Sequence, residues 1–280
     1  MEKHTHEHIK SAFFVNLVFT LIEIVGGLLT NSVAILSDAV HDLGDSVSLG
    51  ISWVLEKISK REPDDKYTYG YQRFSLLGGM ISSLILFGGT IFILTETIPR
   101  LFQPEEVDSL GMLLFSILGV SFNLLAYYKV RGGHSLNEKA VSLHLLEDVF
   151  GWGAIMLGSI LILLFDWAFM DPLLSILIGS YIFLHVLRNL KEIFDVFLQK
   201  VPSSVELSKI EELIKTIPDV LKVYHTHIWT LEGSKNMLTT HVLVNGEASA
   251  SELIKIKRSI REYLEKEGIT HVTIEFEFDR

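Results

Sequence analysis

Two segments of the sequence share a histidine followed four residues later by an aspartate. The pairs are His41 with Asp45 and His144 with Asp148. In an α-helix, residues four apart lie on one face, one turn apart, so each pair can offer two ligands to one point. A set of four imidazole and carboxylate ligands suits tetrahedral Zn²⁺. The sequence has no cysteine, which excludes thiolate ligands and leaves these two ligand types for a metal site.

Both pairs lie inside long apolar stretches, in a chain that is 49% hydrophobic and 21% charged. A helix that spans the hydrocarbon core of a membrane needs roughly 20 mostly apolar residues. The sequence predicts six such helices, over residues 12–29, 33–55, 75–98, 110–128, 140–165 and 172–190. Asp171, as a capping residue before Pro172, is a favourable start for the last of them. We therefore expect an all-α six-helix transmembrane bundle over residues 11–198, after a polar tail over residues 1–10.

Lysine and arginine are distributed unevenly between the expected loops. They are frequent in the links between helices two and three and between helices four and five, and after helix six. The links at residues 30–31 and 166–171 have none, and the remaining link has only Arg100. Because these residues collect in cytoplasmic loops, both termini are expected in the cytoplasm of a bacterium, with the bundle in its inner membrane. The formal charge of −10 argues against a nucleic-acid partner.

Ionisable side chains inside membrane spans mark functional sites, because each costs about 2.5–3.5 kcal/mol on insertion scales. Two carboxylates and two neutral imidazoles around a divalent cation sum to zero charge, which suits a site at membrane depth. Both ligand types must be deprotonated to bind metal, so metal release should accompany proton uptake. The two pairs therefore predict exchange of a divalent cation for protons across the membrane. The alternative is that each pair is a buried polar contact between helices.

Five further polar residues share the spans of the two pairs or lie in the first span. Asp38 lies one turn before the first histidine, where it could line the access route. Asp42 and Glu147 point about 100° away from their neighbours on a helix, so they face a water-filled vestibule or pair elsewhere. Asn16 and Glu23 are seven residues apart and share a face of the first helix. For these two residues, lining the cavity and packing the helices are both open.

Residues 203–280 read as a soluble sequence with two helical and three strand patterns. One helix is expected after the capping residues Ser203 and Ser204, and another after Ser249 or Ser251, ending at Gly268. Strands are expected over residues 220–231, 237–245 and 271–278. This αββαβ order predicts a small α+β domain over residues 202–280, with an open sheet and helices on one face.

Several longer runs accompany the two pairs, namely residues 31–45 (Asn-Ser-Val-Ala-Ile-Leu-Ser-Asp-Ala-Val-His-Asp-Leu-Gly-Asp), 67–73 (Tyr-Thr-Tyr-Gly-Tyr-Gln-Arg), 171–175 (Asp-Pro-Leu-Leu-Ser) and 227–229 (His-Ile-Trp). With these runs the sequence resembles the cation diffusion facilitator family, especially its zinc-transporting members. The resemblance implies a homodimer in the lipid bilayer that exports Zn²⁺ in exchange for H⁺, with a ferredoxin-like, metallochaperone-like cytoplasmic domain. It carries the family's transport ligands onto His41, Asp45, His144 and Asp148. Histidine at the first of these positions resembles the zinc-selective pattern, although Co²⁺ or Cd²⁺ could also be carried.

The resemblance also implies a cytoplasmic metal site on the sheet of the C-terminal domain. His241 matches the second-strand ligand, whereas the first-strand position is Tyr224, next to His225. Two acidic residues match the positions on the last strand. The candidate ligands of a regulatory Zn²⁺ are His225, His227, His241, Glu275 and Glu277, and the alternative is a set of surface histidines. Metal bound there could bias the membrane helices between inward-open and outward-open states.

The sequence departs from the family pattern in two loops. Some bacterial members carry a second metal site of histidines between helices two and three, where this chain has Tyr67 and Tyr71, so that site is not expected. The loop between helices four and five is histidine-rich in many members and has here the single His134. An N-terminal metal collector, or else a solvated tail, is expected from His4, His6 and His8.

Three other functions fit this metal-ligand pattern less well. A channel tends to use rings of charges or carbonyls with weak, multiple sites, whereas one tight tetrahedral site favours a carrier. An intramembrane metalloenzyme would need an open metal position and a nearby base. Asp42 or Glu147 could nominally be that base, but no His-Glu-x-x-His is present. A metal-sensing receptor would need an output domain, and the tail has no recognisable signalling motif. A transporter rather than an enzyme is therefore predicted.

Overall fold

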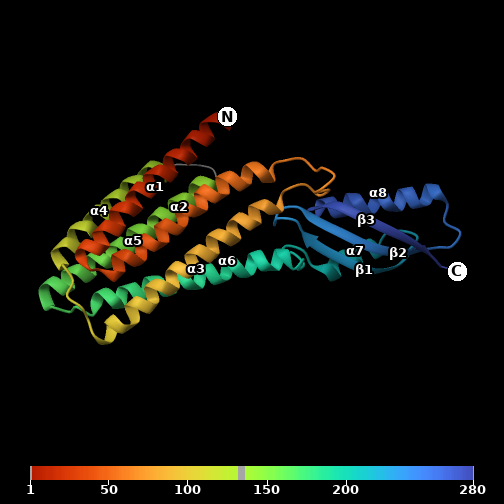
Figure 1. The fold of residues 1–280 in the computed structure, drawn as a ribbon. Coiled ribbons are helices and arrows are strands. Elements are labelled where there is room, and N and C mark those ends of the chain that lie inside the picture. Colours follow the sequence, from red (N-terminus) through yellow and green to blue (C-terminus); the bar gives the residue numbers. More distant parts are fainter. Residues whose placement is uncertain (1, 132–135, 280) are drawn as a thin grey trace. The chain divides into compact units, whose positions relative to one another are not determined.

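Six long helices form most of the first part of the chain (Figure 1). The computed structural model describes residues 2–131 and 136–279, with side chains from residue 16 onwards except at 48–49, 52–53, 56, 129–130 and 136–141. The helices are α1 (Glu2–Thr30), α2 (Val33–Ser59), α3 (Arg73–Phe102), α4 (Ser109–Val130), α5 (Leu136–Phe165) and α6 (Met170–Phe197). Each of them contains one of the six predicted spans, so the helical bundle of the fold prediction is confirmed. The largest difference is at α1, which begins at Glu2 and so includes most of the segment predicted as a polar tail.

Most of these helices have the length and composition of membrane spans. Among the described residues, α3, α4, α5 and α6 are long and apolar enough to cross a membrane. The described side chains of α1 form a shorter apolar segment, Asn16–Thr30. α2 has a comparable length of 27 residues but contains Asp38, Asp42 and Asp45. The first predicted ligand pair therefore lies on a helix that carries three aspartates.

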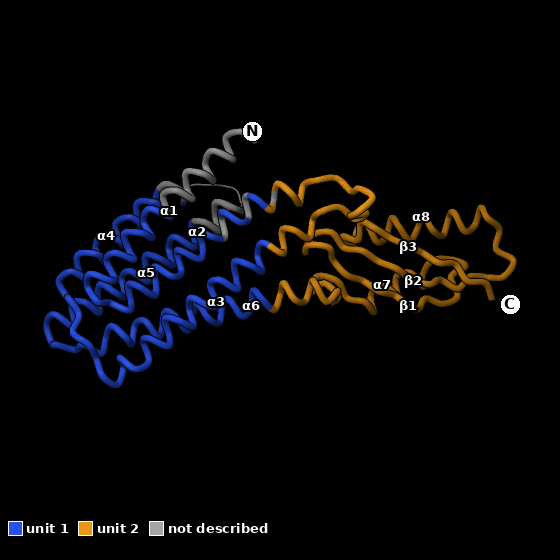
Figure 2. The backbone as a smooth tube through the Cα atoms, in the orientation of Figure 1, with its two compact units in different colours: residues 1–54, 78–190 blue, residues 55–77, 191–280 orange. Residues whose placement is uncertain are grey.

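The chain divides into two compact units, residues 1–54 with 78–190 and residues 55–77 with 191–280 (Figure 2). In the first unit, aromatic side chains pack neighbouring helices together. Phe19 of α1 stacks on Phe122 of α4 with ring centroids 4.3 Å apart. The buried Trp152 of α5 lies directly against Gly119 of α4, where an added Cβ would come within 2.1 Å of the indole. Glycine is therefore needed at this position for α4 and α5 to approach so closely.

The start of α2 is fixed by a carboxylate from α6. Asp171, in the first turn of α6, is buried and accepts hydrogen bonds from the backbone N–H of Val33 (2.9 Å) and Ala34 (3.2 Å) and from the Ser32 hydroxyl (2.5 Å). The expectation that Asp171 caps its own helix is corrected, because α6 already begins at Met170. The carboxylate instead satisfies the free N–H groups of another helix, which also favour a negative charge.

The second unit contains a small α+β domain. Its elements are α7 (Leu207–Lys215), β1 (Val220–Thr230), β2 (Asn236–Val244), α8 (Ala250–Lys266) and β3 (Ile269–Phe278). β2 lies between β1, to which it is antiparallel, and β3, to which it is parallel. The parallel pair needs a long crossover, which α8 provides. Isoleucines of α7 and α8 are buried in one core with the sheet, so the predicted αββαβ domain is confirmed.

Two helix boundaries of this domain can be compared with the prediction. α7 begins at Leu207 after the N-cap residue Glu206, so the expected capping by Ser203 and Ser204 is wrong. Ser249 caps α8 and forms a capping box with Glu252, as one of the two predicted alternatives. The side-chain bonds of Ser249 lower the pKa of the Glu252 carboxyl.

The loop between α2 and α3 belongs to the same compact unit as this domain. Asp64 in this loop accepts hydrogen bonds from the Tyr71 hydroxyl (2.7 Å) and from the backbone N–H of Tyr67 (2.8 Å). The Tyr71 bond is the main reason that the pKa of Asp64 is lowered. The Tyr69 ring meets His271 of β3 edge-on, with ring centroids 5.9 Å apart. The loop therefore contacts the last strand of the sheet.

Candidate metal centre

The two His/Asp pairs meet between α2 and α5. His144 Nε2 lies 2.9 Å from Asp45 Oδ2, which joins the two pairs directly. Within each pair the histidine Nε2 and the aspartate Oδ2 are 3.9 Å apart, both for His41 with Asp45 and for His144 with Asp148. One ligand atom from each of His41, His144 and Asp148 can be chosen so that all three lie within 4.8 Å of one another. The sequence-predicted ligands thus come together at one place.

These separations are close to those of a tetrahedral site. Zn²⁺ binds imidazole nitrogen and carboxylate oxygen at about 2.0–2.2 Å, so neighbouring ligand atoms in a tetrahedron are about 3.3–3.6 Å apart. The distances of 2.9 and 3.9 Å fall on either side of this value. Small side-chain rotations would therefore enclose an ion of this size.

A cavity of about 460 Å³ reaches these ligands. Its wall includes His41, Asp45 and His144, and continues over the early turns of α3, at Ser82 and Ser83. The remaining polar lining comes from α5 and α6: Glu147, Tyr181, His185 and Asn189. Since α3 begins and α6 ends at the same end of the bundle, the cavity extends from the ligands towards that end.

Asn16 packs α1 onto the helix that carries the first pair. Its side-chain amide donates to the Asp42 carbonyl oxygen (3.2 Å) and to the Ser46 hydroxyl (3.0 Å). Of the two readings left open by the sequence, the contacts match helix packing. The lining of the 460 Å³ cavity does not include Asn16.

The other predicted neighbours of the ligands divide between the cavity and the helix interior. Glu147 is exposed on the cavity wall, where the Tyr181 hydroxyl donates to it at 3.4 Å. Glu23, Asp38 and Asp42 are buried, and none of them lines this cavity. The two Glu23 oxygens have no hydrogen-bond partner among the described atoms. The expected access role of Asp38 and Asp42 therefore gains no support from the cavity lining.

His185 is a cavity residue that sequence reasoning missed. It lies in α6, outside both His/Asp pairs, and lines the same cavity as His41, Asp45 and His144. The available signal was the presence of an imidazole in an otherwise apolar span, which is uncommon unless the side chain reaches a cavity or a partner.

Two known family models match this chain, one over the helical bundle and one over the α+β domain. Residues 9–198 match the family model of the cation efflux transmembrane domain, and residues 202–278 match that of the cation efflux protein cytoplasmic domain. The chain belongs to the cation diffusion facilitator family. It is accordingly an integral, multi-pass membrane protein and a transporter rather than an enzyme.

Several relatives are similar over almost their whole length. The metal cation efflux system protein CzcD of Cupriavidus metallidurans is 36% identical over 98% of this chain and 89% of the relative. The cadmium, cobalt and zinc/H⁺–K⁺ antiporter of Bacillus subtilis is 33% identical, over 95% and 87%. The zinc transporter ZitB of Pectobacterium atrosepticum is 33% identical, over 99% and 89%. A solved metal-bound C-terminal domain of CzcD is 34% identical over 26% of this chain and 99% of that chain, with a TM-score of 0.24.

In this cation diffusion facilitator, a second histidine–carboxylate group lies on the C-terminal sheet. His241 of β2 places Nδ1 2.7 Å from Glu277 Oε1 and Nε2 3.6 Å from Glu275 Oε2, both on β3. The Tyr224 hydroxyl of β1 also donates to Glu277. The bond from His241 is the main cause of a lowered pKa at Glu277, and the bond to Glu277 raises the pKa of Tyr224.

A β-bulge brings His225 into this group. The pairing of β1 with β2 shifts between Tyr224 and His227, and His225 has a positive φ of 51°. A bulge redirects the side chain of the extra residue. The His225 ring accordingly lies 5.2 Å from that of His241, measured between centroids. His227 lines a separate pocket with Trp229, although its ring lies 6.0 Å from that of His225.

One further prediction concerns the N-terminal histidines. The side chains of His4, His6 and His8, the predicted metal collector at the start of α1, lie outside the described residues, as does His134.

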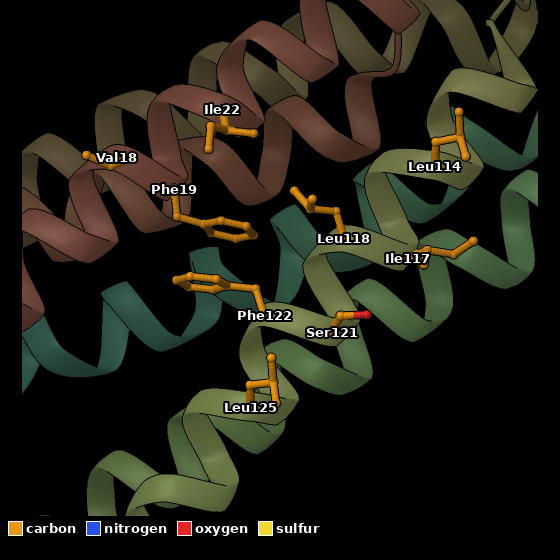
Figure 3. A pocket seen from close by; sticks show the side chains of 9 residues that line it. All are labelled: Val18, Phe19, Ile22, Leu114, Ile117, Leu118, Ser121, Phe122 and Leu125. Carbon is orange, nitrogen blue, oxygen red and sulfur yellow. The ribbon is translucent and has the colours of Figure 1, made fainter.

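A larger cavity, about 760 Å³, lies between α1 and α4 and is lined by apolar side chains and Ser121 (Figure 3). Because this lining offers no ionisable group, the cavity has no part in metal chemistry.

Proposed function

We propose that the chain is a secondary active transporter that exports divalent metal cations, chiefly Zn²⁺, in exchange for protons. The transport ligands in this proposal are His41, Asp45, His144 and Asp148. The observation that carries it is the meeting of two His/Asp pairs beside one cavity. Cd²⁺ and Co²⁺ are included as further substrates because a relative similar over most of the chain is named for cadmium, cobalt and zinc.

The contact between the two pairs supports the coupling of metal to protons. His144 Nε2 and Asp45 Oδ2 are close enough for the imidazole N–H to donate to the carboxylate. Zn²⁺ needs the lone pair of this nitrogen, so the proton must leave Nε2 before the metal binds there. When the metal leaves, the imidazole can take up a proton again. Metal and proton thus compete for one position, which is what exchange requires.

The cavity indicates how metal would reach the ligands. It extends towards the end of the bundle at which α3 begins and α6 ends. Since lysine and arginine collect in the loops of that end, we assign it to the cytoplasm. The cavity is then the cytoplasmic route, and release on the other side needs a change of conformation.

The proposal extends to organisation and location. In this proposal residues 1–10, most of which form the first turns of α1, collect metal in the cytoplasm. Residues 11–198 are the membrane domain, and residues 202–280 are the cytoplasmic domain. The protein lies in the lipid bilayer of a bacterial inner membrane, with both termini in the cytoplasm, and acts as a homodimer. Support comes from the uneven distribution of lysine and arginine and from the match of residues 202–278 to a cytoplasmic domain.

We also propose a regulatory Zn²⁺ in the cytoplasmic domain, bound by His225, His241, Glu275 and Glu277. The rings of the two histidines are near each other, and both carboxylates contact His241. His227 is a less favourable ligand because it lines a different pocket. A route to the membrane helices exists in the α2–α3 loop, since Tyr69 contacts β3.

Zinc uptake into proteoliposomes with an imposed pH gradient tests the transport proposal. Uptake by the wild type should be saturable and should rise with the gradient. Asp45→Ala and His144→Ala each remove a ligand and should lower uptake at least about 100-fold, more than the loss of a supporting residue would. The matched control is Asp65→Ala, which removes an exposed aspartate of the α2–α3 loop. Wild-type uptake by Asp45→Ala would disprove the site, and uptake insensitive to the gradient would disprove the coupling.

A further inference from the structure

We propose that His185 of α6 and Glu147 of α5 form a separate capture site, which binds the metal ion in the cavity before it reaches the four transport ligands. This inference rests on the proposed function and adds to it a residue that selects the substrate. The two side chains line the same cavity as His41, Asp45 and His144. An ion that moves along this cavity to the ligands therefore passes them.

The capture site is distinct from the transport site. The ligand atoms that can be chosen within 4.8 Å of one another belong to His41, His144 and Asp148, and neither His185 nor Glu147 is among them. In the sequence, Glu147 lies directly before Asp148, so it points to a different side of α5. The cavity wall thus carries a second donor set beside the first.

Both proposed ligands are free to bind an ion. Both side chains are exposed, and both line the cavity. Glu147 accepts one bond from a neutral group, the Tyr181 hydroxyl, and no basic side chain among the described residues forms an ion pair with it. No hydrogen bond joins His185 to another described side chain. A carboxylate and an imidazole in this state gain from binding a cation.

The α6 helix presents these groups as one stripe. Tyr181, His185 and Asn189 are spaced four residues apart, so they lie on one face of the helix, and all three line the cavity. Asn189 donates to Ser83 of α3 at 2.9 Å, which holds this face against the neighbouring helix. His185 therefore occupies the middle of a polar stripe that leads along the cavity.

The chemistry of the pair fits a substrate filter. Mg²⁺ and Ca²⁺ prefer oxygen ligands, whereas imidazole favours Zn²⁺, Co²⁺, Ni²⁺ and Cu²⁺. One imidazole and one carboxylate leave the remaining coordination positions to water, so the ion is held less tightly than by four protein ligands. Weak binding of this kind allows a rapid transfer to the transport site. His185 thus concentrates transition-metal ions at the point where they are needed.

Zinc titrations of transport in proteoliposomes made from the full chain test this inference. His185→Gln keeps a polar side chain but should raise the KM for Zn²⁺ about five- to tenfold and leave kcat within about twofold, because the transport ligands are intact. The tetrahedral absorption bands of bound Co²⁺ should be unchanged in this variant. The matched control is Glu192→Gln, which removes an exposed carboxylate of α6 that does not line the cavity.

A second substitution gives a readout that a structural role would not produce. His185→Cys replaces imidazole by a softer ligand, so the ratio of kcat/KM for Cd²⁺ to that for Zn²⁺ should rise several-fold. An unchanged KM in His185→Gln together with an unchanged metal ratio in His185→Cys would overturn the inference. A lowered kcat with an unchanged KM in His185→Gln would also overturn it, because it would indicate a role in the conformational step. If Asp45→Ala transports zinc normally, the proposed function itself has failed, which separates the two outcomes.

Discussion

The histidine–carboxylate groups of the bundle and of the C-terminal sheet use the same ligand types in different settings. In the bundle, the spacing within each pair is fixed by one helix, and Asp148 has a side-chain exposure of 14%. On the sheet, the ligands come from three strands, and Glu275 is 68% exposed. Glu277 is already held by His241 and Tyr224. Metal binding in the bundle therefore displaces one internal contact, between His144 and Asp45, whereas on the sheet it displaces the two hydrogen bonds of Glu277.

The largest expected effect comes from removing one carboxylate charge from each group. Asp148→Asn leaves the bundle site with an uncompensated positive charge when metal is bound, so zinc transport should fall about 100-fold. Glu277→Gln removes a charge that water can screen, and transport should fall less than about threefold. Initial rates of zinc uptake for the two variants measure this contrast. Equal losses would show that the two groups depend on their charges in the same way.

The next prediction tests whether the bundle group depends on the position of α2. Asp171→Ala leaves the first N–H groups of α2 without their partner and should destabilise the protein by about 1–2 kcal/mol. Because His41 follows the start of α2 by about 12 Å along the helix, zinc transport should fall about tenfold as well.

Asp108→Ala is the matched control for this effect. Asp108 caps α4 by accepting a hydrogen bond from the Gly111 N–H at 3.0 Å, and α4 carries no predicted transport ligand. This variant loses one hydrogen bond at an exposed cap, so thermal unfolding should show a loss of about 0.5–1 kcal/mol, and transport should stay within about twofold of the wild type. Equal transport in the two variants would contradict a specific role for the α2 cap.

A smaller effect is expected on zinc binding to the sheet group. Tyr224→Phe frees Glu277 from one of its two hydrogen bonds, so the affinity of the sheet for Zn²⁺ should rise about threefold. His225→Ala removes a proposed ligand and should lower it about tenfold. Calorimetric titration of the full chain isolates this site in a background of Asp45→Asn and His185→Gln in which His4, His6 and His8 are replaced by alanine. A weaker affinity in Tyr224→Phe would mean that the hydroxyl helps to bind the metal.

The smallest effect concerns the pH dependence of the sheet. The pKa of Glu277 is lowered in the folded state, mainly by His241. Its contribution to stability is therefore present above the unfolded-state pKa of about 4.3 and is lost as the pH falls through the folded-state value. Hydrogen exchange of β3 amides should be slower in the wild type than in Glu277→Gln at pH 7. The difference should vanish in strongly acidic solution, and its persistence there would contradict this assignment.

The bundle and the face that each His/Asp pair shares could be predicted from the sequence because their signals are local. The six spans are marked by the length and composition of the apolar runs. The two histidines and two aspartates were found because each pair shares one helix face, so only the approach of two helices had to be assumed. The αββαβ order of the tail was likewise marked by alternation, turns and the cap at Ser249.

The remaining features depend on contacts between distant parts of the chain. The role of Asp171 needs a partner 138 residues away at Val33. The packing role of Asn16 and the cavity position of His185 depend on which helix faces become neighbours. From the sequence, His225 was assigned to the sheet site only because it is next to Tyr224. The bulge that brings it there depends on how β1 pairs with β2, so it could not be predicted from the residues of β1 alone. The start of α7 was misplaced because Ser203 and Ser204 are good caps that the chain leaves in a turn.

The close approach of Gly119 and Trp152 restricts how the ligands on α5 can move. The indole fills the space that a side chain on α4 would otherwise occupy. Sliding of one helix past the other would drive the ring into backbone, so the two helices must travel together through a transport cycle. Any movement that separates His144 from Asp45 therefore moves α4 together with α5. A crosslink between α4 and α5 should leave the rate of transport unchanged.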